Sequence, residues 1–338
     1  MIKNLTAPSD QFWNEKKLTI LIPALNEKEN LESLIPYICE SISDLNLNLK
    51  FKVLIIDDGS SDGTSELIER KFYNDDKVNL ITLRSNVGKS LALNIGLRSI
   101  TSDYLITMDA DHQDDADDIV KFLCKLEDGY ELVCGSRLNR NDTHFRKVGS
   151  KIFNWALIKS SNLRVSDFNC GFKGYSKDLY SSLIIYGHYH RFIPFIASLN
   201  GFNIDEVQVR NNSRLHGQSK YKALRYEGLF DLLSLIFIHK YGLNPLHFFG
   251  KISALIAIPS FIVIFYFIVS QFLFLIGFGD AFMVENRPLI LISIGGILFS
   301  LIILMTGFVC DFFLHHIIND RMVSIIKSTI KTNNQKNT

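Results

Sequence analysis

The sequence predicts an α/β protein with a mostly parallel, Rossmann-like sheet, followed by interface helices and a C-terminal transmembrane hairpin of two helices. Three observations support this prediction. Short apolar runs alternate with segments of helical periodicity in the first part of the chain. A polar motif follows each apolar run. Two uncharged stretches, each long enough to cross a membrane, lie near the end of the chain.

Five short apolar runs are expected to form strands. They are Leu18–Ile22, Phe51–Ile56, Val78–Leu83, Tyr104–Met108 and Glu131–Cys134. Between them lie segments with apolar residues at helical spacing: Glu27–Ser41, Thr64–Phe72, Lys89–Ser99 and Ala116–Leu126. Because parallel strands are joined by crossover helices, this alternation predicts right-handed crossovers and a mostly parallel sheet.

The composition limits the classes of function. The 338 residues carry a formal net charge of +1, so no basic excess attracts the chain to nucleic acid. The five cysteines have no CxxC spacing, which is typical of small buried residues in a reducing compartment. The first 17 residues are polar and charged, so no cleavable signal peptide is expected and the N-terminal part is expected to stay in the cytoplasm.

The two uncharged stretches are Ile252–Phe278 and Leu289–Cys310. The second has 22 residues, which makes a helix of about 33 Å against a hydrocarbon core of about 30 Å. Buried core helices are the alternative, but two such runs joined by the short connector Gly279–Pro288 favour a membrane hairpin. Lysine and arginine are more frequent outside the hairpin than in its connector, which predicts that both termini are cytoplasmic.

These features divide the chain into four predicted parts. Residues 1–220 form a cytoplasmic α/β domain, and residues 221–250 form amphipathic helices at the membrane interface. Residues 251–316 form the two transmembrane helices, and residues 317–338 form a basic cytoplasmic tail. The alternative for the second part is a core helix of the α/β domain, because it mixes apolar residues with charged ones.

The polar motifs follow the predicted strands. They are Pro23-Ala-Leu-Asn-Glu27, Asp57-Asp-Gly-Ser60, Asn86-Val-Gly-Lys89, Asp109-Ala-Asp111 and Gly135-Ser-Arg137. The carboxyl ends of parallel strands share one edge of a sheet, and ligands bind at that edge. We therefore expect the five motifs to form one site.

Asp109 and Asp111 are the central signal, because two carboxylates at this spacing can point into one site. Adjacent carboxylates are costly unless a cation neutralises them, which implies a hard divalent ion with oxygen ligands. The expected cofactor is Mg²⁺ or Mn²⁺, completed by phosphate oxygens. The four aspartates between positions 114 and 118 are expected to be solvated or to favour a helix N-terminus.

Two further motifs suit a nucleotide. Asp58 could hold ribose hydroxyls or base N–H groups, although a capped turn is the alternative. Asn86 and Lys89 open a helix whose N–H groups, with the flexible Gly88, suit a diphosphate; a solvated Lys89 is the alternative. The chain has no Walker loop and no GxGxxG motif, so ATPase and dinucleotide-binding functions are disfavoured.

The order of these motifs resembles that of family-2 glycosyltransferases with the GT-A fold. Within this family, the sequence is most similar to dolichyl-phosphate mannose synthase and the bacterial polyprenyl-phosphate glucosyltransferases. The resemblance extends from Leu18 to Tyr221 and includes the C-terminal pair of spans. It implies a nucleoside pocket and a metal and diphosphate segment. The residues implied are Pro23, Asn26, Glu27 and Asp58 for the nucleoside, and Asp109, Asp111 and Gln113 for the metal and diphosphate.

A second group of residues is implied to hold a lipid phosphate. Arg137 ends a strand, Arg146 and Ser150 lie four apart on one face of a predicted helix, and Arg214 follows later. Arginine presents a planar, permanently charged fork that suits phosphate oxygens. Surface ion pairs are the alternative for each arginine, and Lys147 could replace Arg146.

Asp167 matches an aspartate that the family places before a Gly-Phe segment, here Gly171-Phe172. It could face the reacting centre as a base or as an orienting group, with a turn cap as the alternative. The predicted catalytic residues are therefore Asp111, Asp167 and Arg137.

The predicted reaction is the inverting transfer of a hexose from a UDP-glucose or GDP-mannose type donor to a polyprenyl or dolichyl phosphate, at the cytoplasmic face of a membrane. A phosphate monoester has a second pKa near about 6, so this nucleophile needs no strong base. Transfer to a hydroxyl of a lipid-linked glycan, and a non-catalytic membrane scaffold that binds nucleotide sugars, are the alternatives. Homo-oligomers are compatible with either reaction.

Overall fold

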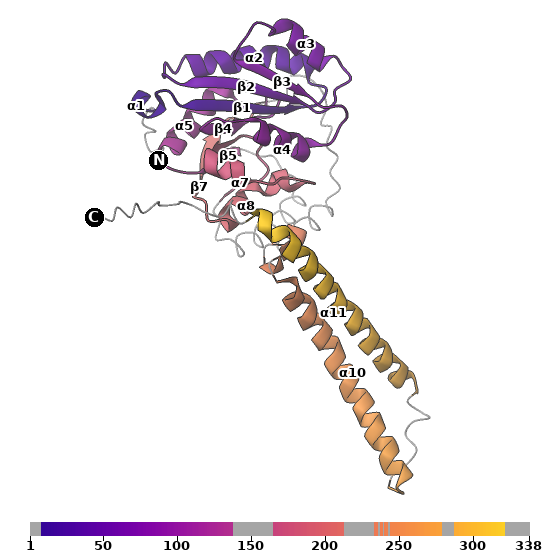
Figure 1. The fold of residues 1–338 in the computed structure, drawn as a ribbon. Helices are drawn as coiled ribbons and strands as arrows, with labels where there is room; N and C mark the ends of the chain where they lie inside the picture. Colours follow the sequence, from indigo (N-terminus) through magenta and orange to yellow (C-terminus); the bar gives the residue numbers. More distant parts are fainter. Residues whose placement is uncertain are drawn as a thin grey trace, which may run out of the picture. The chain divides into compact units, whose positions relative to one another are not determined.

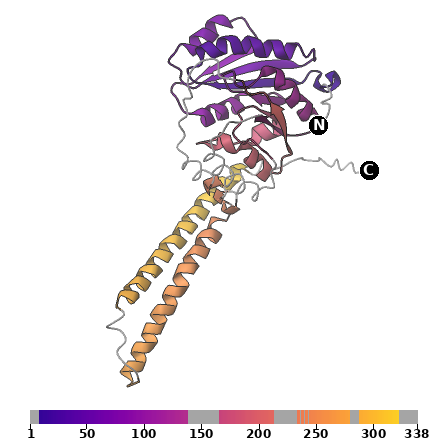
Figure 2. The same ribbon diagram turned by 180° about the vertical axis from the view of Figure 1, so that it is seen from behind.

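The computed structural model describes residues 8–137 and 165–212, together with most of residues 233–278 and 287–321. The chain forms two compact units, Met1–Asp231 and Leu232–Thr338, and each unit is described by itself. Figures 1 and 2 show both units from opposite sides.

The first unit is built on a sheet of seven strands in the order β3-β2-β1-β4-β6-β5-β7. The strands are β1 Lys17–Ala24, β2 Lys50–Asp57, β3 Val78–Thr82, β4 Tyr104–Thr107, β5 Leu132–Arg137, β6 Lys173–Ser176 and β7 Ile204–Val209. Neighbouring strands pair in parallel, except that β6 is antiparallel to both β4 and β5. The predicted mostly parallel sheet and its five expected strands are confirmed.

The described helices of the first unit include the four that were predicted between strands. They are α1 Asp10–Trp13, α2 Lys28–Ser43, α3 Thr64–Lys71, α4 Lys89–Ser99, η1 Ala116–Asp118, α5 Ile119–Glu127, α7 Lys177–Ser182, η2 Tyr189–Phe192 and α8 Ile193–Leu199. The fourth expected helix begins as the 3₁₀ turn η1, because the Asp115 side chain accepts a hydrogen bond from the Asp117 N–H.

Both faces of the central strands are covered by helices (Figure 1). Ile20 and Ile22 of β1 belong to a buried core that includes the apolar face of α2. Leu21 points to the opposite face, where a Cβ on Gly96 of α4 would lie only 2.6 Å from its side chain. A strand buried on both faces is mostly apolar, and the buried positions of β1 follow this rule except at Thr19, whose buried hydroxyl lies 2.6 Å from Ser102 Oγ.

Two strands were not expected from the sequence. The four residues of β6 contain no apolar run, yet they insert between β4 and β5. This insertion pairs Lys173 with Thr107 of β4 and with Cys134 of β5, at the edge of the sheet where those strands end. The strand β7 then extends the sheet beside β5.

The second unit contains the helices α10 Pro245–Leu275 and α11 Arg287–Arg321 (orange to yellow in Figures 1 and 2). Pro245–Leu275 and Pro288–Leu314 are long and apolar enough to cross a membrane, each with a mean hydropathy of 2.6. The two helices contact each other through small residues: Ser253 Oγ donates to the Ser300 carbonyl at 2.8 Å, and Gly296 lies against Ser260. Close contact through small residues is typical of membrane helix pairs.

Candidate active site

Hydrogen bonds join the first two motifs at the carboxyl ends of β1 and β2. The Asn26 N–H donates to Ser60 Oγ at 2.8 Å, and the Ser61 N–H donates to Asn26 Oδ1 at 2.8 Å. Asn26 has a φ of 52°, a left-handed conformation that asparagine adopts more readily than most residues. Glu27 donates its N–H to Thr64 Oγ1 at 3.3 Å. Pro23, on β1, precedes this turn and pairs in register with Ile56.

Asp58 joins the second motif to the third. Its carboxylate is buried and accepts the Val87 N–H at 2.7 Å and the Gly88 N–H at 2.9 Å. The loops approach closely at Gly59, where a Cβ would lie 2.6 Å from the Ser85 carbonyl carbon, and its φ of +71° also favours glycine. Asn86 adds a hydrogen bond from the Gly88 N–H to its own Oδ1 at 3.1 Å.

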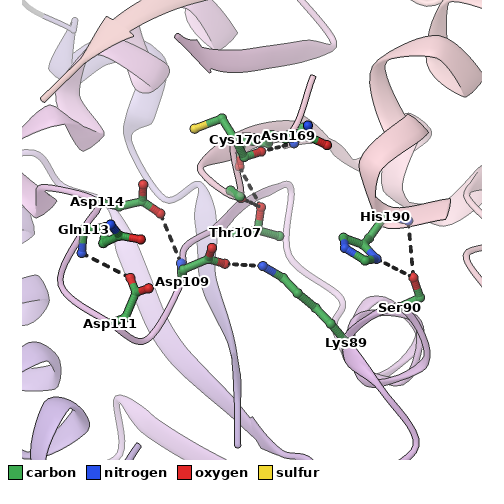
Figure 3. A network of polar contacts seen from close by, with 12 residues as sticks. Lys89, Ser90, Thr107, Asp109, Asp111, Gln113, Asp114, Asn169, Cys170 and His190 are labelled. Carbon is green, nitrogen blue, oxygen red and sulfur yellow. Dashed lines mark hydrogen bonds and ion pairs between the residues drawn. The ribbon is translucent and has the colours of Figure 1, made fainter. Parts of the chain in front are cut away.

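The loop after β4 holds the paired aspartates (Figure 3). Asp109 Oδ1 accepts from the Lys89 ammonium at 2.5 Å, which joins the third and fourth motifs. The Asp109 N–H donates to Asp114 Oδ2 at 3.1 Å. The Gln113 N–H donates to Asp111 Oδ1 at 3.2 Å, and Asp111 is 7% exposed. The loop thus brings three carboxylates close to a single edge of the sheet.

The turn between Asp111 and Gln113 is fixed by His112. This residue has a φ of 62°, and its Nε2 lies 3.0 Å from the Asn30 carbonyl and 2.9 Å from Ser33 Oγ of α2. The contact anchors the loop to a helix of the core.

The pKa values of Asp109 and Asp114 are shifted in opposite directions. Burial acts to raise the pKa of Asp109, but Lys89, followed by Arg137 and Lys173, brings it below its ordinary value. For Asp114, burial and the negative charge of Asp109 raise the pKa to about 7. The two pKa values diverge because Lys89 contacts Asp109 directly, whereas Asp114 lies beside the negative charge of Asp109.

The segment that precedes β6 forms a wall against Asp109. A Cβ on Gly171 would lie 2.5 Å from Asp109 Oδ1, so only a glycine fits there without movement. Thr107 Oγ1 donates to the Gly171 carbonyl at 2.7 Å, and the buried ammonium of Lys173 donates to the Cys170 carbonyl. The sequence reasoning missed Lys173, since its strand was not recognised.

Arg137 and Asp167 form an ion pair at the end of β5. Arg137 Nε lies 3.2 Å from Asp167 Oδ2, and its Nη2 donates to the Asn169 carbonyl at 3.2 Å. Asp167 Oδ1 also accepts the Asn169 N–H at 3.1 Å. Both side chains are mostly buried, at 19% and 9% exposed. The two residues were predicted separately, and the structure brings them together.

Arg146, Ser150 and Arg214 lie outside the described residues. Their predicted contact with an acceptor phosphate therefore stays a prediction.

The aspartates after Gln113 were expected to be solvated or to favour a helix N-terminus, and the second alternative is confirmed where Asp115 caps η1, whose first turn holds Asp117 and Asp118. Asp114, Asp115 and Asp118 are buried rather than solvated. Arg210, which follows β7, explains the last two: its Nε lies 3.1 Å from Asp115 and 3.3 Å from Asp118. The sequence offered no sign of this arginine, because β7 was not expected beside the loop.

The contact between the buried Ser90 and the partly buried His190 was also missed. Ser90 Oγ lies 2.7 Å from His190 Nδ1, which joins the first turn of α4 to η2 (Figure 3). Burial, and then the charge of Lys89, lowers the pKa of His190 to about 3, so this imidazole is neutral. The two residues lie 100 positions apart, too far for any local pattern to connect them.

The predicted metal residues suit a cation that also binds phosphate. Among the described residues, no cluster of three His, Cys, Asp or Glu side chains is arranged to hold a metal ion. Mg²⁺ needs only one or two carboxylates when phosphate oxygens complete its shell. Asp111 and Asp109, with the Gln113 amide beside them, offer such hard oxygen donors. Because Lys89 already contacts Asp109, Asp111 is the residue that would ligate the cation first.

Residues 19–184 match the model of the family described as "Glycosyl transferase family 2". This part of the chain belongs to glycosyl transferase family 2. The family prediction made from the motifs is thereby confirmed, and so is the GT-A fold.

Solved structures show the same fold at low sequence identity. Glucosyl-3-phosphoglycerate synthase from Mycobacterium tuberculosis, in complex with phosphoglyceric acid, is 19% identical; the match covers 65% of this chain and 79% of that one, with a TM-score of 0.52. The same enzyme with Mg²⁺ and UDP is 20% identical over 65% and 79% of the two chains, with a TM-score of 0.52. Mannosyl-3-phosphoglycerate synthase from Rubrobacter xylanophilus is 15% identical over 68% and 76%, with a TM-score of 0.53.

Proposed function

We propose that this glycosyltransferase moves a hexose, with inversion, from a UDP-glucose or GDP-mannose type donor to a polyprenyl or dolichyl phosphate. We further propose that it is an integral membrane protein with a cytoplasmic catalytic domain. The observation that carries the proposal is the cluster of Lys89, Asp109 and Asp111 at the carboxyl edge of the sheet, in a chain that also has two membrane-length helices.

The donor site is supported by charge and by family. Lys89 offers an ammonium to a diphosphate, and Asp111 offers a carboxylate to the cation that accompanies it. Such a cation, when bound, offsets the charge that develops on the leaving diphosphate. Structures of the mycobacterial relative contain UDP with Mg²⁺, and UDP-glucose with Mn²⁺, which agrees with a nucleotide-sugar donor.

The acceptor site is proposed to be centred on Arg137. Its guanidinium is held by Asp167 Oδ2 and by the Asn169 carbonyl, so its fork has one orientation. A phosphate monoester is already an anion near pH 7 and requires no strong base. Asp167 then serves to orient Arg137, which is the contact that it makes in the structure. A hydroxyl acceptor would instead require Asp167 as a base.

The lipid nature of the acceptor is supported by the second unit. Only 17% and 11% of the most apolar windows of α10 and α11 are buried, whereas a core helix would be mostly buried. Leu255 and Leu291, for example, are 73% and 69% exposed. Exposed apolar surface of this length is suited to lipid. The relatives named for phosphoglycerate indicate the main rival, a small phosphorylated acceptor in solution.

The test uses the full chain, purified in detergent with Mn²⁺. Radiolabelled UDP-glucose and GDP-mannose are each supplied with a short polyprenyl phosphate, the corresponding polyprenol, 3-phosphoglycerate or no acceptor, and label is counted in the organic and aqueous phases. We expect organic-phase label only with the polyprenyl phosphate. Label on 3-phosphoglycerate alone would refute the lipid acceptor, and label on polyprenol would refute the phosphate nucleophile.

Two variants connect the activity to the site. Asp111→Asn and Arg137→Gln should each lower the transfer rate by about 100-fold or more, because each removes a charge that contacts a reactant. Asp76→Asn and Arg70→Gln are matched controls, since both side chains are exposed on the surface of the first unit. Full turnover by Asp111→Asn would rule out its role toward the cation.

A further inference from the structure

Lys89 is the cation that Asp109 contacts in this structure. The two atoms Lys89 Nζ and Asp109 Oδ1 lie 2.5 Å apart, and the side chains are 19% and 33% exposed. Lys89 is the first residue of α4, and Asp109 follows β4, so the pair connects two separate loops of the edge. Figure 3 shows the lysine extended toward Asp109, with Asp111 on the side of Asp109 away from the lysine.

Neighbouring residues hold both members of the ion pair between Lys89 and Asp109 in place. The Ser90 to His190 hydrogen bond of 2.7 Å holds the first turn of α4, which carries Lys89. Gly171 leaves no room for Asp109 to retreat, since a single methyl group there would already lie 2.5 Å from Oδ1. The ion pair is therefore part of the packed fold, unlike an exposed surface pair, which is seldom held in one geometry.

The surroundings of Asp109 are unfavourable for a cation that arrives alone. Besides Lys89, the positive charges of Arg137 and Lys173 act on this carboxylate. A bare divalent ion would have to displace the Lys89 ammonium from Asp109 against the repulsion of these cations. A divalent ion that arrives with a diphosphate brings little net charge, and the phosphate oxygens give Lys89 a new partner.

We propose that Lys89 is an internal counter-ion, which compensates Asp109 until a nucleoside diphosphate arrives and thereby makes binding of the divalent cation depend on the nucleotide. The proposal rests on the proposed use of a nucleotide-sugar donor and deepens it. Lys89 moves from the carboxylate to a phosphate oxygen, and Asp109 then adds its negative charge to that of Asp111 beside the cation. No bond is made or broken in this exchange.

The experiment measures Mn²⁺ binding by the electron paramagnetic resonance signal of the free ion. The purified full chain is titrated with Mn²⁺ alone, with Mn²⁺ and UDP, and with Mn²⁺ and GDP, always without an acceptor. We expect the wild type to bind Mn²⁺ about 10- to 100-fold more tightly when the nucleotide is present, a range typical of coupled sites. By linkage, Mn²⁺ must tighten nucleotide binding by the same factor.

The variant Lys89→Met removes the competing charge. It should bind Mn²⁺ alone about tenfold more tightly than the wild type and lose most of the nucleotide dependence, because the carboxylates are then uncompensated. Lys89→Arg should behave as the wild type. The matched control is Lys71→Met, which removes an exposed lysine that pairs with Glu32 at 3.1 Å on another helix.

Two results would overturn the proposal: equal Mn²⁺ affinity of the wild type with and without nucleotide, or no gain in Mn²⁺ affinity in Lys89→Met. If circular dichroism shows that Lys89→Met is unfolded, Asp109→Asn decides, because it releases Lys89 and should tighten the binding of UDP or GDP without metal. Unchanged nucleotide affinity in Asp109→Asn also rejects the counter-ion. If the protein does not glycosylate the lipid, these binding results still test the counter-ion. If neither UDP nor GDP binds in the presence of Mn²⁺, both the proposed function and this inference are wrong.

Discussion

The contact between Gly171 and Asp109 allows a sharp test of how the site is built. Gly171→Ala adds one methyl group, whose carbon would lie 2.5 Å from Oδ1 and 2.7 Å from Oδ2 of Asp109. Real Cβ contacts are essentially never shorter than 3.0 Å, so the carboxylate must move by about 0.5 Å. Gly171 is not among the glycines with positive φ, so alanine brings no backbone strain and the effect is that of the contact.

Gly171→Ala should affect stability through overpacking and activity through displacement of the Asp109 carboxylate. Overpacking of a close contact costs about 1–3 kcal/mol in unfolding free energy, which lowers the thermal midpoint by roughly 3–10 °C. The oxygen that must move is the one that contacts Lys89 at 2.5 Å, so the ion pair is lost or lengthened. A misplacement of about 1 Å in a catalytic site can reduce the rate by about 100-fold, so we expect kcat/KM to fall about 10- to 100-fold.

The assay combines thermal unfolding by circular dichroism with the transfer assay. Gly174→Ala is the matched control, because its neighbours Leu126 and Phe122 are flexible side chains at 3.3–3.5 Å and no polar group of the site is touched. It should retain wild-type kcat/KM. A Gly171→Ala protein with both midpoint and kcat/KM of the wild type would show that the close packing of Asp109 is unimportant.

Three further predictions concern other ionisable side chains. The pKa of His190 is about 3 in the fold and 6.5 in an unfolded chain, so the unfolding free energy falls on acidification below pH 6.5, by up to about 1.4 kcal/mol per pH unit. In His190→Gln, the urea midpoint should therefore change less between pH 7 and pH 5 than in the wild type. Arg210→Met should lower the unfolding free energy by about 0.5–1.5 kcal/mol, since it removes a guanidinium from the buried carboxylate of Asp118, which keeps Lys121 at 2.8 Å; an unchanged urea midpoint would contradict this. Burial raises the pKa of Cys134 to about 12 and that of Cys170 to about 11, so iodoacetamide at pH 8 should label them only after denaturation, as read by mass spectrometry; labelling of the native protein would disprove their burial.

The general architecture could be derived from the sequence for a simple physical reason. Strands that are buried on both faces are mostly apolar, and Leu18–Ile22, with the single hydroxyl of Thr19, and Val53–Ile56 show this pattern. The strand β6 escaped notice, because its four residues include a glycine and a buried lysine, and only its two neighbours in the sheet make it a strand.

The sequence by itself determined which chemical groups stand at the carboxyl edge: Asp58, Lys89 and Asp109 each follow a strand, Arg137 ends one, and parallel strands end together. Only the tertiary structure decided what each group contacts. Lys89 compensates Asp109, Asp167 orients Arg137, and Arg210 holds the acidic turn, although none of these partners is adjacent in the chain. Electrostatic compensation depends on distance in space, which falls below 4 Å only once the loops are packed, and no local pattern in a sequence records that distance.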